Sequence, residues 1–267
     1  MYSTVGHSTN LLGIPTGLLA STAFNDYPLP LHISGVLETN RHFFEQLSQA
    51  ENLADASVLF QDYMNVVFGL DDAATNTAAD GKRRYRASYL RLLKGWGFDA
   101  NSQEGAVLKG WVESRFGIFP TFHKEPLRRF SSAAWAGYVE EKMSSRFHNN
   151  SIGLQLDLLY EFCQWALGRW FHARQRHLTL YRGVNDFSEH RIIHQAHDRA
   201  LVLRLNNLVS FSADRNIAGE FGDYILETMV PAVKILFFNE LLPHHPLKGE
   251  AECLVIGGDY QVKVAYL

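Results

Sequence analysis

The hydrophobic pattern of this chain changes once, near His177, and that change limits the folds that the chain can adopt. Before it, from about residue 38 to residue 172, apolar residues recur at the spacing of amphipathic helices. These helical segments begin near Glu38, Ala54, Arg84, Gln103, Ala133 and Ile152. After it come short runs rich in β-branched and aromatic residues, which predict strands: LTLYR, LVLRL, LVSFS, YILETMV, VKILFF, ECLVI and QVKVAYL. Helices first and strands afterwards, without regular alternation, predict an α+β fold.

The length of 267 residues suits one large domain or two small ones. Residues 71–81 and 147–151 are rich in turn-forming residues and predict surface loops, but neither resembles a long linker. We therefore expect a single domain over residues 1–267, with a helical part at 1–177 and a β-rich part at 178–267. Within the helical part, the segment that begins at Ile152 is apolar on nearly every side, which predicts a central buried helix.

Composition and charge exclude several classes of protein. The hydrophobic fraction of 46% and the charged fraction of 20% are those of an ordinary globular protein. A formal net charge of -3 gives no overall basic field, so no nucleic-acid partner is expected. The first 21 residues lack a basic segment, and Gly13, Pro15 and Gly17 interrupt their apolar stretch, which argues against a signal peptide and a membrane span. We expect a cytoplasmic protein.

The cysteines and histidines give no sign of a metal site. Cys163 and Cys253 each lie in an apolar run, which favours two buried thiols in a reducing compartment over a disulfide or a metal pair. HExxH and paired CxxC motifs are absent, and the adjacent His244 and His245 cannot easily reach one ion. The glycine-rich fingerprints of dinucleotide-binding and P-loop folds are absent too. A bound nucleotide would have to be held in another way.

The first of three informative segments is the strand LTLYRG, which ends in Arg182 and Gly183. A planar guanidinium offers paired donors to phosphate oxygens, and a neighbouring glycine lets a ligand approach the backbone. This arginine can therefore brace a pyrophosphate. A surface arginine at a strand end is the alternative.

The second segment contains Ser210 and Ser212, which strand periodicity places on one face, with Phe211 on the other. Residues 215–222 follow and predict one or two helical turns that carry Phe221 back over the serine face. Hydroxyl pairs are common in strands, so an ordinary polar strand face is the alternative.

The third segment places Glu250 and Glu252 at the entry to an apolar strand. Strand geometry would put both carboxylates on one face, about 7 Å apart at the backbone. Like charges so placed repel, and a ligand that uses them would account for the pair. The alternative is a solvated strand end.

In this order, Tyr181-Arg182-Gly183, Ser210-Phe211-Ser212 and Glu250-x-Glu252 resemble the signature of the R-S-E class of ADP-ribosyltransferases. Over its whole length, including residues 10–21 and the Phe24-Asn25 pair, the chain resembles the dinitrogenase reductase ADP-ribosyltransferases of nitrogen-fixing bacteria. The resemblance implies a mostly antiparallel β-sandwich core of the ADP-ribosyltransferase type after the helical region. The chain departs from the family pattern in the middle motif, which reads Ser-Phe-Ser where the family often has Ser-Thr-Ser. The motif therefore supports a role for Ser212 less strongly than a role for Ser210.

The resemblance implies that NAD+ is the co-substrate and is cleaved at its nicotinamide bond without a metal. It implies that Glu252 stabilises the cationic sugar, and that Ser210 contacts the ribose and Glu252. The other implied NAD+ contacts are Arg182 on the pyrophosphate side, the Gly183 backbone at the nicotinamide amide, Ser212, and Phe221 stacked on nicotinamide. Glu250 implies arginine as the acceptor, because it would take up the guanidinium proton.

The resemblance further implies a protein substrate, the nitrogenase iron protein, and a PII signalling protein as regulator. Residues 239–248 are expected to form a surface loop that meets the substrate, and residues 81–94 to form a basic helical surface. Two alternative functions are compatible with the same fold and site. An NAD glycohydrolase would pass the ADP-ribose to water, and an inactive binding module would keep the fold for protein recognition.

Overall fold

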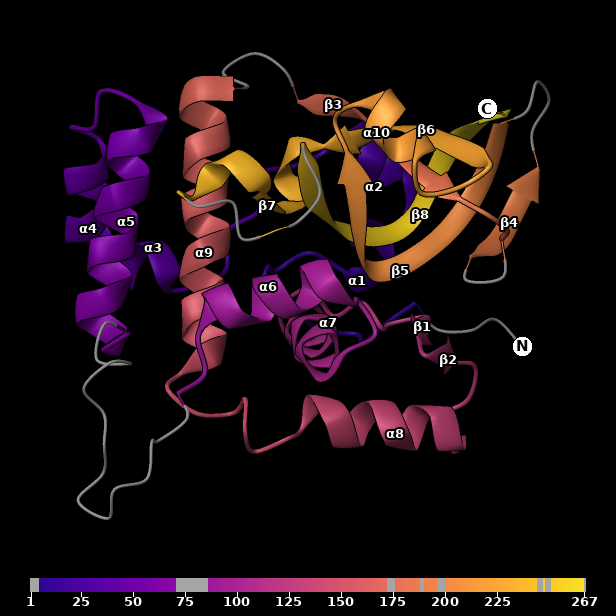
Figure 1. Cartoon of the computed structure of the whole chain (residues 1–267), viewed down its shortest axis with the longest axis horizontal. Helices are drawn as coiled ribbons and strands as arrows, with labels where there is room; N and C mark the ends of the chain where they lie inside the picture. Colours follow the sequence, from indigo (N-terminus) through magenta and orange to yellow (C-terminus); the bar gives the residue numbers. More distant parts are fainter. Residues whose placement is uncertain are drawn as a thin grey trace.

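The computed structural model describes residues 5–70, 86–171, 176–187, 190–195, 200–243, 247 and 251–266. Helices occupy the N-terminal part of the chain, and a curled antiparallel sheet occupies the C-terminal part, drawn in orange to yellow in Figure 1. The predicted α+β fold is confirmed.

The long helices, α5 to α9, follow the predicted order. The bounds of all the helices described are α1 Thr16–Leu19, α2 Thr22–Asp26, α3 Val36–Thr39, α4 Arg41–Leu47, α5 Leu53–Phe68, α6 Tyr89–Phe98, α7 Gln103–Phe116, α8 Ala133–Lys142 and α9 Ile152–Ala166, with a π-helical continuation Leu167–Phe171. Side-chain caps explain several starts, because the side chains of Asn52, Ser88, Ser102 and Ser132 accept backbone N–H groups of the first turn. The sequence does not predict α1 and α2, since four or five residues carry too little periodicity.

The central helix is α9, which stands between α5 and β7 in Figure 1. Leu156, Leu159 and Phe162 are fully or almost fully buried. Phe162 stacks on Phe60 of α5, with 4.3 Å between the ring centroids. The prediction of a central buried helix is therefore confirmed.

The sheet has six strands in the order β4-β5-β3-β6-β8-β7. Their bounds are β3 His177–Val184, β4 Arg191–Gln195, β5 Ala200–Ser212, β6 Tyr224–Pro231, β7 Ile235–Phe238 and β8 Glu252–Tyr266; β1 Phe122–His123 and β2 Glu125–Pro126 form a separate hairpin. Because β5 also pairs with β8, the strands β5, β3, β6 and β8 form a closed circuit. Tyr181 and Ser212 are the residue pair that joins β3 to β5. The antiparallel core is thus one curled sheet.

Two pairs of predicted strands are single long strands in the structure. Residues 201–205 and 208–212 join in β5 through an irregularity at Asn206 and Asn207, and ECLVI joins QVKVAYL in β8. A Cβ on Gly257 would lie 1.7 Å from the Asn206 carbonyl oxygen, so this crossing requires glycine. The side-chain amide of Asn207 donates to the carbonyl oxygens of Lys109 and Ile118, at 2.8 and 3.0 Å. The irregularity therefore fixes α7 against the sheet.

The N-terminal segment is tied to the sheet by polar contacts. The backbone N–H of Asp259 donates to the Ala20 carbonyl at 2.7 Å, and the Asn25 amide donates to the Asp259 carbonyl at 3.0 Å. Lys234 is fully buried and donates to Asn25 Oδ1 at 2.6 Å. Burial lowers the pKa of Lys234 to about 7. Phe24 and Asn25, which contribute to the family resemblance, are therefore structural residues.

The hydrophobic core is continuous between the two parts of the chain. One cluster of buried residues includes Phe60 and Leu159 from the helices and Leu203 and Val255 from the sheet. We therefore propose a single domain over residues 1–267. Both cysteines are buried free thiols, as the sequence predicts. None of the helices in the described residues is long and apolar enough to cross a membrane.

Candidate functional site

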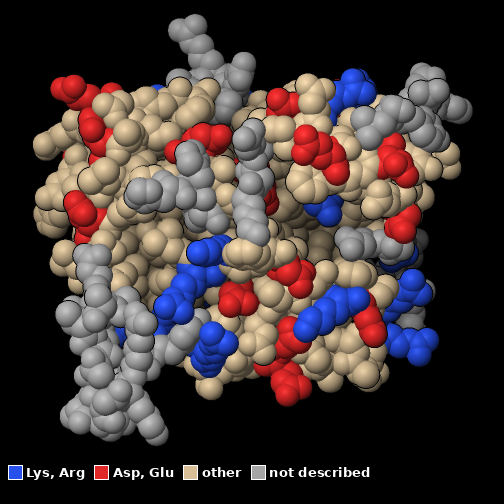
Figure 2. All heavy atoms as spheres, in the orientation of Figure 1, with Lys and Arg blue, Asp and Glu red and all other residues tan. Residues whose placement is uncertain are grey.

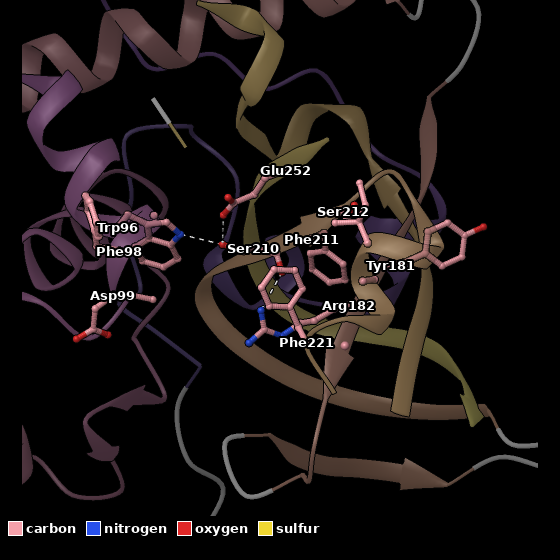
Figure 3. A pocket seen from close by; sticks show the side chains of 15 residues that line it. Trp96, Phe98, Asp99, Tyr181, Arg182, Ser210, Phe211, Ser212, Phe221 and Glu252 are labelled. Carbon is pink, nitrogen blue, oxygen red and sulfur yellow. Dashed lines mark hydrogen bonds between the residues drawn. The ribbon is translucent and has the colours of Figure 1, made fainter. Parts of the chain in front are cut away.

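The predicted site residues gather around a cavity of about 530 Å³ between the C-terminal end of α6 and the sheet, shown in Figure 3. Its lining consists of residues 96–100, 181–183 and 210–212, together with Ile217, Ala218, Phe221 and Glu252. Ligand pockets for small molecules usually measure roughly 300–1,000 Å³. The cavity therefore has the size of a ligand site, and its walls come from both parts of the chain.

Ser210 and Glu252 form the polar centre of this cavity. They lie on the paired strands β5 and β8, where Ser212 is directly opposite Glu252 and Ser210 is opposite Leu254. The Ser210 hydroxyl donates to Glu252 Oε1 at 2.7 Å. The structure thus brings together a hydroxyl and a carboxylate that are 42 residues apart in sequence.

Arg182 lies on β3 and reaches across to β5. Its Nη1 donates to the Ser210 carbonyl oxygen at 2.9 Å, and its side chain is half-buried in the cavity wall. This hydrogen bond lies beside the Tyr181–Ser212 pair that closes the circuit of strands. The guanidinium is therefore held in a fixed place close to Ser210, as an anion-binding arginine must be.

Gly183 lines the cavity, but packing already requires a glycine there. A Cβ at this position would lie 2.1 Å from the carbonyl oxygen of Ala218 in the short helix α10, Arg215–Gly219. A side chain would therefore displace α10 from β3. The glycine that the sequence predicts for ligand approach is therefore also required by the packing of α10 on β3.

The predicted helical turn after β5 is confirmed as α10, and it carries Phe221 to the cavity. The Phe221 ring is 62% exposed, and Figure 3 shows it in front of Arg182. Phe221 also lines a second cavity of about 250 Å³ beside Asn185, Asp186 and His190. An exposed aromatic ring between two cavities is available for stacking on a planar ligand.

Ser212 also lines the cavity, but its hydroxyl has a local partner. The backbone N–H of Asp214 donates to Ser212 Oγ at 3.0 Å, just before α10. The Asp214 side chain in turn caps α10. Ser212 therefore helps to shape the turn that presents Phe221.

Glu250 lies outside the described residues. The residue between the two glutamates, Ala251, has a φ of 53°, and β8 begins only at Glu252. The prediction that both carboxylates lie on one face requires an extended chain at Ala251. The structure contradicts this requirement, because the positive φ of Ala251 lies outside the extended region and β8 begins only after this residue.

Trp96 is the site residue that sequence reasoning missed. It lies near the end of α6, is 4% exposed, and its indole N–H donates to Ser210 Oγ at 2.9 Å. The spacing of apolar residues explains only its burial. Nothing in the sequence signals that its N–H meets a hydroxyl 114 residues away.

The one thiol next to Glu252 is not available as a nucleophile. Cys253 follows Glu252 directly, and burial raises the pKa of its thiol to about 12, so the thiol stays protonated at neutral pH. Within the same residues, no group of three or more His, Cys, Asp and Glu side chains could hold a metal ion. His244 and His245 lie outside them.

The expected surface loop at residues 239–248 is only partly correct. A 3-10 turn, Asn239–Leu241, begins it, and Leu241, Leu242 and Leu247 are buried because these apolar side chains join the core. Of the expected basic surface, residues 81–85 lie outside the described part, whereas Arg91 and Lys94 are exposed on α6, where basic side chains gather in Figure 2.

Comparisons with known proteins agree with the geometry. The family model for dinitrogenase reductase ADP-ribosyltransferase matches residues 9–264. A curated relative from Rhodospirillum rubrum, NAD(+)--dinitrogen-reductase ADP-D-ribosyltransferase, is 60% identical over 266 residues, which cover 98% of this chain and 96% of the relative. No solved structure matches the chain. A family match over nearly the whole chain, together with this identity, shows that the protein belongs to the dinitrogenase reductase ADP-ribosyltransferase family.

Proposed function

We propose that this protein cleaves NAD+ at the nicotinamide bond and transfers the ADP-ribose to an arginine of dinitrogenase reductase. The observation that carries the proposal is the hydrogen bond between Ser210 and Glu252, at 2.7 Å, on the wall of a 530 Å³ cavity beside Arg182. The name of the relative from Rhodospirillum rubrum states ADP-ribose transfer between NAD+ and dinitrogen reductase, which supports the same co-substrate and the same protein substrate.

In the proposed cleavage step, the bond between ribose C1′ and the nicotinamide nitrogen breaks. Its electron pair leaves with nicotinamide, which becomes neutral, so the leaving group requires neither a metal nor an acid. Positive charge then develops at C1′ and the ring oxygen of the ribose, as in glycoside hydrolysis. The Glu252 carboxylate stabilises this charge, through the ribose 2′-hydroxyl, and Ser210 holds both the carboxylate and the ribose.

We assign the other NAD+ contacts from the family resemblance, and the positions of the side chains around Ser210 support them. Arg182 would bind the pyrophosphate, because its guanidinium lines the cavity and offers several N–H donors. Phe221 would stack on nicotinamide, and the Gly183 backbone would contact its amide. Ser212 lines the same cavity, and its hydroxyl accepts the Asp214 N–H in the turn that precedes α10.

The acceptor arginine needs a base, because a guanidinium with a pKa above about 12 is a poor nucleophile. We assign this role to Glu250, next but one to Glu252 in the sequence. One guanidinium nitrogen bonds to C1′ on the face opposite the departing nicotinamide, and its proton passes to the Glu250 carboxylate. The products are the ADP-ribosylated arginine, nicotinamide and one proton.

Attachment of ADP-ribose to dinitrogenase reductase would block its electron delivery and so halt nitrogen fixation. A PII signalling protein is the proposed regulator, and the cytoplasm the proposed location. These finer assignments rest on the family resemblance.

The function can be tested with NAD+ labelled in its adenylate phosphate and purified dinitrogenase reductase. We expect label on one arginine of that protein and nicotinamide release in equal amount. Glu252→Gln should lower both transfer and NAD+ hydrolysis by 100-fold or more, about 3 kcal/mol, in line with the loss of other preorganised electrostatic groups. Glu250→Gln should lose transfer and keep some hydrolysis.

Two outcomes would contradict the proposal. Label found only as free ADP-ribose, with every protein unmodified, would indicate an NAD glycohydrolase. Equal rates for Glu252→Gln and the parent would remove Glu252 from the reaction.

A further inference from the structure

We propose that Trp96, in the helical part of the chain, is a positioning residue for NAD+ cleavage that sets the direction of the Ser210–Glu252 hydrogen bond. This inference rests on the proposed function, because it concerns the same carboxylate. It assigns a part in the reaction to α6, which carries none of the residues of the sequence signature.

The hydrogen-bond chemistry of the two side chains fixes the direction. An indole N–H can only donate, whereas a serine hydroxyl has one hydrogen to donate and two lone pairs to accept. Trp96 Nε1 lies 2.9 Å from Ser210 Oγ, so the serine oxygen accepts from the indole. The single serine hydrogen is then left for Glu252 Oε1, at 2.7 Å. The chain of donation runs from Trp96 through Ser210 to Glu252.

Hydrogen bonds in such a chain strengthen one another, because each donor polarises the next. With the indole removed, the Ser210 hydroxyl could rotate and donate to other acceptors, including the ribose or water. Glu252 would then lose a fixed donor and become less well oriented toward the sugar. Loss of this orientation should lower kcat more than it changes KM, because the carboxylate acts most strongly when positive charge develops on the ribose in the transition state.

The indole is itself held in place. Leu92 and Leu93 on the same helix are fully buried, and the backbone N–H of Tyr89 donates to Gln155 Oε1 of α9 at 3.0 Å. The buried Lys109 of α7 lies over the Trp96 ring, 5.8 Å from its centroid. This cation–π contact from α7 adds to the packing that holds the indole ring against β5.

A purely structural tryptophan is the competing explanation, and the chain offers a matched control for it. Trp111 of α7 is 5% exposed, and its indole N–H donates to Asp157 at 2.7 Å, a contact between α7 and α9 outside the NAD+ cavity. Trp96→Phe and Trp111→Phe each remove one indole donor from a buried helix position. They differ in whether the donor faces Ser210.

The test measures nicotinamide release and transfer to dinitrogenase reductase, together with thermal unfolding of each variant. Trp96→Phe should lower kcat of both reactions about tenfold, while KM for NAD+ stays within about twofold of the parent. Trp111→Phe should lower the unfolding temperature and keep kcat. In a Ser210→Ala background, Trp96→Phe should have almost no further effect on kcat, because the intermediary hydroxyl is gone.

A second measurement keeps Trp96 in place. In protein labelled with ¹⁵N at the indole nitrogens, the N–H resonance of Trp96 should shift in Ser210→Ala, which removes its hydrogen-bond acceptor. It should also shift in Glu252→Gln, which changes the hydrogen-bond partner of Ser210. The absence of any indole shift in Ser210→Ala would overturn the inference. So would an unchanged kcat for Trp96→Phe, or a tenfold loss that persists in the Ser210→Ala background.

Failure of this inference differs from failure of the proposed function. A parent protein that releases no nicotinamide from NAD+ would contradict the function. An active parent whose kcat is indifferent to Trp96→Phe would contradict only the role of Trp96.

Discussion

The buried Lys234 makes the stability of this protein depend on pH in a way that can be calculated from the structure. Its ammonium nitrogen donates to Asn25 Oδ1 and lies 5.4 and 5.0 Å from the centroids of the Phe24 and Tyr260 rings. These contacts do not replace the lost hydration, and burial lowers the pKa from 10.5 to about 7. Above pH 7 the folded protein therefore holds a neutral amine.

The sign of the effect follows from proton linkage. Between pH 7 and pH 10.5 the lysine of the unfolded chain binds a proton that the folded protein does not, so stability rises with pH in this window. Each pH unit is worth about 1.4 kcal/mol, and the whole difference corresponds to at most about 5 kcal/mol. The full destabilisation is present below pH 7 and disappears as pH approaches 10.5.

The substitution Lys234→Met isolates this contribution, because it replaces the amine by an apolar side chain of similar length. Urea unfolding of parent and variant should show the variant to be more stable by several kcal/mol at pH 7.5. That advantage should shrink by about 2–3 kcal/mol on going to pH 9.5. The exposed Lys94→Met variant controls for the loss of a lysine as such. A difference between Lys234→Met and parent that stays constant over this pH range would refute the reasoning.

Two further substitutions test the backbone of the site. Gly183→Ala should displace α10, because the added Cβ would meet the Ala218 carbonyl oxygen. We expect KM for NAD+ to rise several-fold and the free energy of unfolding to fall by about 1–3 kcal/mol. An unchanged KM and an unchanged unfolding temperature would contradict the packing argument. Ala251→Gly should raise stability by about 1 kcal/mol, since the φ of 53° costs an alanine roughly that amount. Urea unfolding measures this gain, and Ala251→Val should lose stability at the same position.

The sequence predicts the elements of this fold better than their connections. Periodicity and apolar runs locate α5 to α9 and the segments that become β3, β5, β6 and β8, because each of these segments buries apolar side chains over several turns or several pairs of residues. It misses β4, whose described residues are all exposed, and it divides β5 at Asn206. A polar pair within an apolar run resembles a turn. Only the opposite strand, with its glycines, shows that the chain continues as a single strand through this irregularity.

For the candidate site, too, the sequence identifies the residues better than the path of the chain that joins them. The ordered signature identifies Arg182, Ser210 and Glu252, and the structure brings these residues to one cavity. The sequence could not predict that Ala251 would turn the chain between the two glutamates, because alanine rarely adopts a positive φ.

Trp96 was missed for a different reason, and that reason bears on what the helical part does. Periodicity reports only that a side chain is buried, and Trp96 satisfies it as an ordinary core residue. Its proposed role depends on one indole N–H, which meets Ser210 only because α6 and α7 pack on β5. Asn207 of β5 holds α7 in this position through its hydrogen bond to the Lys109 carbonyl oxygen. A sheet that carried the whole signature without these helices would leave Ser210 without its donor. The helical part is therefore better regarded as one wall of the candidate site than as an appendage to it.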